Sequence, residues 1–195
     1  MKDLDKKKEL ILARELAFAN AVGAAVFEKP RVSFWMVLVP LLFLYFIHRM
    51  QKYKSGRMKF DEDFMVTRRR ALELAIETLE SDHRIDLNQA VHQYGLSDKL
   101  EKPYAAWMSV LVDHYRDLLA VDGDNYDILV RKAYHTRTNY LLTLNRLNTV
   151  EKEFYAAIKP KLAAAEGAAE IIATIEKESH RLRRDLAEQV FTGQD

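Results

Sequence analysis

The sequence of 195 residues contains no cysteine, only six glycines and only four prolines. The absence of cysteine excludes disulfide scaffolds, thiolate zinc sites, iron–sulfur clusters and cysteine nucleophiles. The small number of glycines and prolines argues against β-sandwiches and barrels, which need many turns. Hydrophobic residues make up 49% of the chain, which is enough for a buried core and excludes disorder as a description of the whole chain.

The common catalytic motifs are also missing. The sequence has no glycine-rich phosphate loop, no Gly-x-Ser-x-Gly elbow and no His-Glu-x-x-His pair, and its six histidines are scattered. We therefore expect a protein that is not an enzyme and that holds no metal and no cofactor. The alternative is a membrane-associated enzyme whose site is assembled from dispersed residues. The candidates for such a site are Asp113, His114, His135 and Arg137.

Charge is distributed unevenly along the chain. Residues 1–60 contain 12 Lys and Arg against 5 Asp and Glu, a net charge of +7. Residues 61–195 contain 18 against 24, a net charge of −6. A basic first part predicts contact with an anionic partner, either nucleic acid or lipid head groups. Because no nucleic-acid-binding motif accompanies the basic residues, we expect anionic lipid and no nucleic acid.

Residues 32–47 form a run of sixteen residues without a charge. As an α-helix the run would be about 24 Å long, somewhat short of a ~30 Å hydrocarbon core. Aromatic residues at both ends favour a single membrane span, whereas a central proline also permits a re-entrant anchor. A helix buried in a soluble core is the third interpretation. We assign the anchor to residues 32–48, with Phe34, Trp35, Pro40, Tyr45 and Phe46 as its characteristic residues.

A basic segment, residues 49–60, follows the run and is interpreted as a juxtamembrane linker. By the positive-inside rule, it places the C-terminal part of the chain in the cytoplasm and the anchor in the inner membrane. Each cation near an anionic membrane surface contributes about 1 kcal/mol of attraction. The predicted contacts with anionic lipid are Arg49, Lys52, Lys54, Arg57 and Lys59.

Residues 1–31 precede the run. Apolar residues recur at helical spacing from Leu10 to Phe27, and the polar sequence around Pro30 ends the pattern. Burying that polar break inside a bilayer would be costly. We therefore expect an amphipathic helix that lies on the membrane surface before the anchor.

Residues 61–195 predict helices and no strand, arranged as an antiparallel bundle of about four long helices. Apolar residues form a helical stripe over Tyr104–Leu119. Over Tyr126–Leu147 they alternate at spacings of three and four, which is typical of a coiled-coil seam in one helix. The sequence Asn148-Thr-Val-Glu151 matches a capping box and predicts the start of another helix. The last helix is expected over residues 165–186.

Two features of this bundle bear on whether it binds a protein partner, although core packing accounts best for the aromatic residues. The predicted seam places Arg137 at a core position, where its charge must be paired or must reach solvent. The surrounding sequence is rich in tyrosine and tryptophan, which are favoured at interfaces as well as in cores. The candidate partner surface consists of Trp107, Tyr134, Arg137 and Tyr140.

Together these patterns predict an all-α, membrane-anchored protein. An amphipathic helix and one short hydrophobic membrane helix precede a cytoplasmic antiparallel bundle. We expect a scaffold, an adaptor or an accessory subunit of a larger membrane assembly, bound to a protein partner or to a second copy of the chain. A lipid-binding or membrane-shaping module is the other non-enzymatic alternative.

Overall fold

A computed structural model describes residues 2–27, 56–81, 87–92, 96–162 and 168–192. These ranges contain seven α-helices, one short 3₁₀ helix and no strand, so the predicted all-α class is confirmed for them. The elements are α1 (Lys2–Phe27), α2 (Gly56–Ser81), α3 (Leu87–His92), α4 (Asp98–Leu119), α5 (Tyr126–Tyr134), α6 (Arg137–Ile158), the 3₁₀ helix η2 (Lys159–Leu162) and α7 (Ala168–Phe191).

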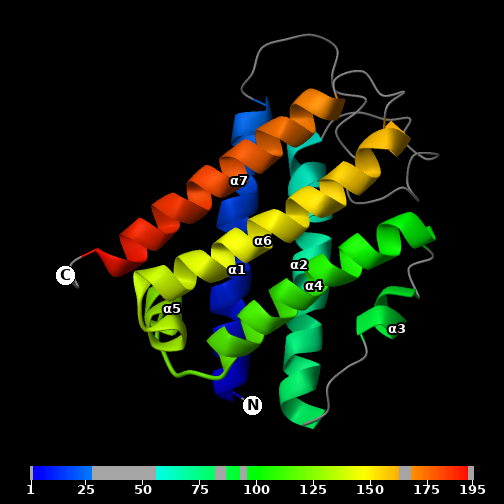
Figure 1. Cartoon of the computed structure of the whole chain (residues 1–195). Coiled ribbons are helices and arrows are strands. Elements are labelled where there is room, and N and C mark those ends of the chain that lie inside the picture. Colours follow the sequence, from blue (N-terminus) through cyan, green and yellow to red (C-terminus); the bar gives the residue numbers. More distant parts are fainter. Residues whose placement is uncertain (1, 28–55, 82–86, 93–95, 163–167, 193–195) are drawn as a thin grey trace.

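The long helices form two crossing layers (Figure 1). In the first layer α4, α6 and α7 lie side by side, with α4 antiparallel to α6 and α6 antiparallel to α7. In the second layer α1 and α2 run antiparallel to each other and cross behind the first layer. Helix α2 packs against α4, and α1 packs against α7. The core lies between the two layers.

Helix α4 lies at the centre of this core because it packs against α2, α3 and α6. The stripe that the sequence predicts over Tyr104–Leu119 is confirmed: Trp107, Met108 and Leu111 are fully buried. Tyr115 and Leu118 continue the same face one and two turns later and are also fully buried. Burying a large apolar side chain contributes roughly 1.5–3 kcal/mol. The stripe on α4 is therefore a main source of the stability of the bundle.

Helix α1 is part of the bundle, whereas its apolar spacing predicts a helix on a membrane surface ahead of the bundle. Ile11, Ala19 and Val22 are fully buried, and α2 and α7 cover this face of the helix. The small side chain of Ala19 and the buried Gly23 allow the neighbouring helices to approach closely. An apolar helix face can be buried equally well against lipid or against other helices, so its periodicity alone does not distinguish the two environments.

The single helix predicted over Tyr126–Leu147 is in fact two helices. The backbone φ of His135 is 62°, and the N–H of Thr136 donates to the carbonyl of Tyr134 over 2.7 Å, which is the hydrogen bond of a γ-turn. Thr136 then caps α6 by accepting a hydrogen bond from the N–H of Asn139 over 3.2 Å. This turn changes the direction and the phase of the chain, so α5 and α6 do not share the predicted coiled-coil seam.

The helix start predicted at Asn148 is wrong, because α6 continues without a break from Arg137 to Ile158. The capping-box pattern occurs here inside a helix. Instead of capping the backbone, the side chains of Asn148 and Glu151 bind the guanidinium group of Arg183 on α7.

We expect the His135→Gly variant to be more stable than the wild-type protein by about 0.5–1 kcal/mol. A side chain held at positive φ in a γ-turn costs about 1–3 kcal/mol, and the greater freedom of glycine in the unfolded chain offsets part of that gain. Urea unfolding followed by circular dichroism measures the difference. Ala156→Gly at an exposed position inside α6 is the matched control and should lose about 1 kcal/mol. An equal loss in both variants would contradict strain at His135.

Helix α2 begins at Gly56, so the last residues of the predicted linker 49–60 are helical. Within the described ranges, no helix combines the length and the apolar character needed to cross a bilayer. The predicted anchor, residues 32–48, and the first part of the linker lie outside the described residues.

Candidate functional site

Four charged side chains form a buried ionic network where α1, α2, α6 and α7 meet. Arg68 on α2 donates from Nε to Glu15 Oε2 on α1 over 2.8 Å, and from Nη2 to Glu151 Oε1 on α6 over 3.1 Å. Arg183 on α7 forms a bidentate pair with Glu151, with donor–acceptor distances of 2.6 and 2.9 Å. Glu151 therefore joins two guanidinium groups from helices that are distant in the sequence.

The network is almost completely removed from water. The side chains of Arg68, Glu151 and Arg183 are 1%, 4% and 5% exposed, and that of Glu15 is 14% exposed. Two carboxylates balance two guanidinium groups, so the cluster has no formal net charge. A buried ion pair tolerates its loss of hydration only while both partners are present. The four helices are therefore held in one arrangement by mutually dependent charges.

The side chains of Glu151 and Arg68 remain ionised although they are buried. Burial by itself would raise the pKa of Glu151, but the adjacent guanidinium groups of Arg183 and Arg68 lower it below its usual value. Burial also opposes the charge on Arg68, but the carboxylates of Glu15 and Glu151 raise its pKa above its usual value. Glu151 and Arg68 are thus charged at neutral pH.

Aromatic rings cover the network. The guanidinium carbon of Arg68 lies 3.8 Å from the centre of the Phe64 ring and 5.9 Å from that of Trp107. The corresponding atom of Arg183 lies 5.2 Å from the centre of the Phe18 ring on α1. Cation–π contacts at desolvated sites contribute up to about 2 kcal/mol each. The rings therefore stabilise the charges and also keep water away from them.

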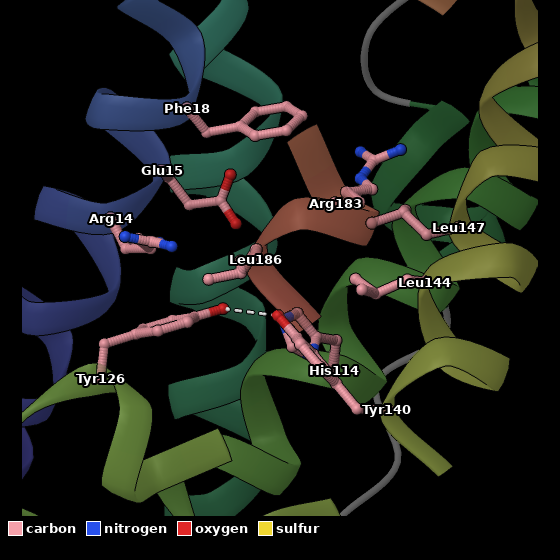
Figure 2. Close-up of a pocket in the computed structure, with 10 residues that line it drawn as sticks. All are labelled: Arg14, Glu15, Phe18, His114, Tyr126, Tyr140, Leu144, Leu147, Arg183 and Leu186. Atoms are coloured by element: carbon pink, nitrogen blue, oxygen red, sulfur yellow. Dashed lines mark hydrogen bonds between the residues drawn. The ribbon is translucent and has the colours of Figure 1, made fainter. Parts of the chain in front are cut away.

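A small cavity of about 30 Å³ adjoins the network, and Glu15 and Arg183 form part of its wall. Figure 2 shows the side chains of Tyr126 from α5 and Tyr140 from α6 pointing toward each other, with their hydroxyl oxygens 3.4 Å apart. The volume is enough for a water molecule but not for a metabolite. The cavity is therefore suited to a single bound water molecule between polar groups.

His114 also lines this cavity, from α4, and is 3% exposed. Its Nδ1 lies 2.5 Å from the hydroxyl oxygen of Tyr134, and its ring is stacked near that of Tyr140. Burial, together with the positive charge of Arg183, lowers the pKa of His114 to about 3. The imidazole is therefore neutral at physiological pH and far from the pKa near 7 that favours proton transfer in catalysis.

The dispersed residues of the alternative enzyme hypothesis do not meet in one site. Asp113 is part-exposed and pairs with Arg116 over 3.4 Å on the surface of α4, while His114 points into the core. His135 is exposed at the γ-turn. Arg137 is 49% exposed and pairs with Glu188 over 2.9 Å, so it does not occupy the core position that the predicted seam gave it. Within the described ranges, His, Asp and Glu side chains also form no group of three or more able to hold a metal ion.

The candidate partner surface is mostly buried. Trp107 and Tyr140 are fully buried and Tyr134 is 6% exposed. The rings of Tyr134 and Tyr140 pack against each other, whereas Trp107 packs against Phe154 and Tyr155. Arg137 is the exception among the four predicted residues. The aromatic richness of this region thus serves the core, which is the other interpretation that tyrosine and tryptophan allow.

The predicted anchor and lipid contacts lie largely outside the described residues. This applies to Phe34, Trp35, Pro40, Tyr45, Phe46, Arg49, Lys52 and Lys54. Arg57 and Lys59 lie at the beginning of α2, and nothing is described of their side chains.

Sequence reasoning missed all four residues of the ionic network. All four carried a signal, because each follows a buried residue by one helical turn: Glu15 follows Ile11, Arg68 follows Phe64, Glu151 follows Leu147 and Arg183 follows Ser179. A charged residue on a buried stripe needs an opposite charge from another helix. The same reasoning was applied to Arg137, which the γ-turn places on the surface.

These features define the chain as an all-α, two-layer helical bundle built around a buried ionic network. No protein-family model matches it, and no curated protein or solved structure matches it either.

Proposed function

We propose that this protein is a non-enzymatic helical scaffold, an adaptor or accessory subunit, held at a membrane by residues 32–47. The observation that carries the proposal is the position of this uncharged run between two helices of the bundle. The C-terminal end of α1 and the N-terminal end of α2 lie at the same end of the bundle, at the top of Figure 1. The run is therefore attached to one end of the bundle.

The composition of the run and its flanks supports a lipid partner. Sixteen consecutive residues without a charge bury favourably in hydrocarbon, at about 25 cal/mol per Å² of apolar surface. Five basic residues follow within about twelve positions and suit anionic head groups on the same side. By the positive-inside rule, the bundle then lies in the cytoplasm.

The chemistry of the described residues supports a structural role. The buried charges bind one another across four helices, His114 is neutral, and the adjoining cavity is too small for a metabolite. A rigid bundle tied to a membrane is suited to position a partner protein there. We expect that partner to be another subunit or a second copy of this chain.

Membrane fractionation of the full chain tests the anchor. We expect the wild-type protein to sediment with membranes and to resist a carbonate wash. The double variant Leu42→Arg with Leu44→Arg places two charges in the run, at a cost of about 2.5–3.5 kcal/mol each, and should move to the supernatant with its helical circular dichroism spectrum intact.

The matched control is Leu142→Arg on α6, where the side chain is 62% exposed and the fractionation should not change. Substitution is preferable to truncation, because a chain that begins near Phe60 lacks α1 and with it Glu15, the partner of Arg68. Wild-type protein in the soluble fraction would contradict the proposal. After mild detergent extraction, a stoichiometric partner supports the scaffold role and a lone monomer argues against it.

A further inference from the structure

The geometry points to a membrane topology in which α1 and the rest of the bundle lie on the same side of the bilayer, so that the run 32–47 enters and leaves through one face. This inference rests on the membrane attachment proposed above and goes beyond it. It also favours the re-entrant anchor over the single span that the aromatic residues alone suggested.

Helix α1 is bound to the bundle along its length. Ile11, Ala19 and Val22 are fully buried among residues of the other helices. At the middle of α1, Glu15 accepts a hydrogen bond from the 1% exposed Arg68 on α2. Removing α1 from the bundle would expose this apolar face and leave a buried guanidinium group with less compensation.

A second attachment holds the N-terminal end of α1. Lys7 is 7% exposed, and its Nζ lies 2.9 Å from Asp122 Oδ1 in the connection between α4 and α5. It also donates to the carbonyl of Leu119, the last residue of α4, over 3.4 Å. Lys6 pairs with the next acidic residue of that connection, Asp124, over 2.7 Å. The N-terminal end of α1 and its middle are thus fixed to parts of the chain that follow the run.

A single span is incompatible with this packing. It would place the residues before and after the run on opposite faces of a hydrocarbon core about 30 Å thick. In the structure, α1 and α2 lie antiparallel and in contact, with their connected ends at the same end of the bundle (Figure 1). Helix α1 cannot contact α2 and also lie across the bilayer from it.

Two complete crossings are excluded by length. Each helical crossing needs about 20 predominantly apolar residues, and the uncharged run has sixteen in all. A run of this length suffices to enter the near leaflet and return, and a central proline permits a re-entrant path. The end of the bundle that carries Phe27 and Gly56 then faces the lipid.

Single-cysteine labelling tests the topology directly, because the chain has no native cysteine. Ala13→Cys on α1 and Ala156→Cys on α6 are matched variants at exposed alanines. Each full-length variant is reacted in sealed membrane vesicles with a membrane-impermeant maleimide, before and after permeabilisation with detergent. The circular dichroism spectrum verifies that each variant is folded.

We expect both cysteines to react from the same side, with extents that agree within about twofold, and to be protected together in vesicles of the opposite orientation. Labelling of Ala13→Cys and Ala156→Cys from opposite sides of a membrane-bound protein would overturn this inference and leave the scaffold proposal standing. If both variants and the wild type are found in the soluble fraction, the membrane attachment is overturned, and the topology with it.

Discussion

The Glu151→Gln variant is expected to lose about 3–5 kcal/mol of its free energy of unfolding. Glutamine keeps the shape of the side chain but not its charge, so the two guanidinium groups would be left with one carboxylate of the network, Glu15, which pairs with Arg68, in a site nearly without water. Domains of this size are usually stable by only about 5–15 kcal/mol, so the loss removes a large part of the total. Equilibrium unfolding in urea, followed by circular dichroism, measures the change.

Two further variants distinguish the loss of a charge from the buried network from the loss of an ordinary ion pair. Glu188→Gln removes the exposed partner of Arg137 and should cost less than about 1 kcal/mol. Glu151→Leu combined with Arg183→Met removes both members of one buried pair and leaves Arg68 with Glu15, so it should recover part of the lost stability. A loss below about 1 kcal/mol in Glu151→Gln would contradict a desolvated network.

Acidification between about pH 6.5 and pH 3 is expected to destabilise the protein through His114. Burial and the charge of Arg183 lower the pKa of this imidazole from 6.5 to about 3 in the folded state, so in this window only the unfolded chain binds the proton. The stability that neutral His114 contributes is therefore complete above pH 6.5 and is lost as the pH falls, by up to about 1.4 kcal/mol per pH unit. Urea unfolding at several pH values between 5 and 7 measures this slope.

The His114→Gln variant should flatten the slope between pH 5 and 7, because glutamine does not titrate. His180→Gln, at an exposed position on α7, should leave it unchanged. Measurements above pH 5 also separate the effect of His114 on stability from that of Glu151. The pKa of Glu151 is lowered in the folded state, so its contribution to stability is lost only at more acidic pH. Equal slopes in the wild type and in His114→Gln would show that another group causes the pH dependence.

The helices were largely predictable because their signals are local. The stripe on α4 and the apolar positions of α7, such as Ile172 and Ile175, follow helical spacing and are buried as expected. The division between α5 and α6 was not predictable from spacing, since apolar residues continue at intervals of three and four through His135. Neither glycine nor proline marks the γ-turn, and Thr136 was its one local signal as an N-cap residue.

The ionic network could not be predicted as a unit. Its partners are separated by 53 residues for Glu15 and Arg68, and by 83 residues for Arg68 and Glu151. Each residue lies on the buried stripe of its own helix, but nothing in its local sequence identifies the opposite charge that it meets. Only the crossing of the two helix layers brings them together.

Residue types and their spacing were enough to predict that the chain is helical, which faces of its later helices are apolar, and that an uncharged run interrupts a basic first part. These properties depend on residue type and on spacing within one helix. The tertiary structure alone decided that α1 belongs to the bundle, that Trp107 and Tyr140 are core residues, and that the two helices flanking the run meet at one end. Those outcomes depend on which apolar faces cover one another, and a face of given periodicity gains nearly the same free energy against lipid, another helix or a partner protein.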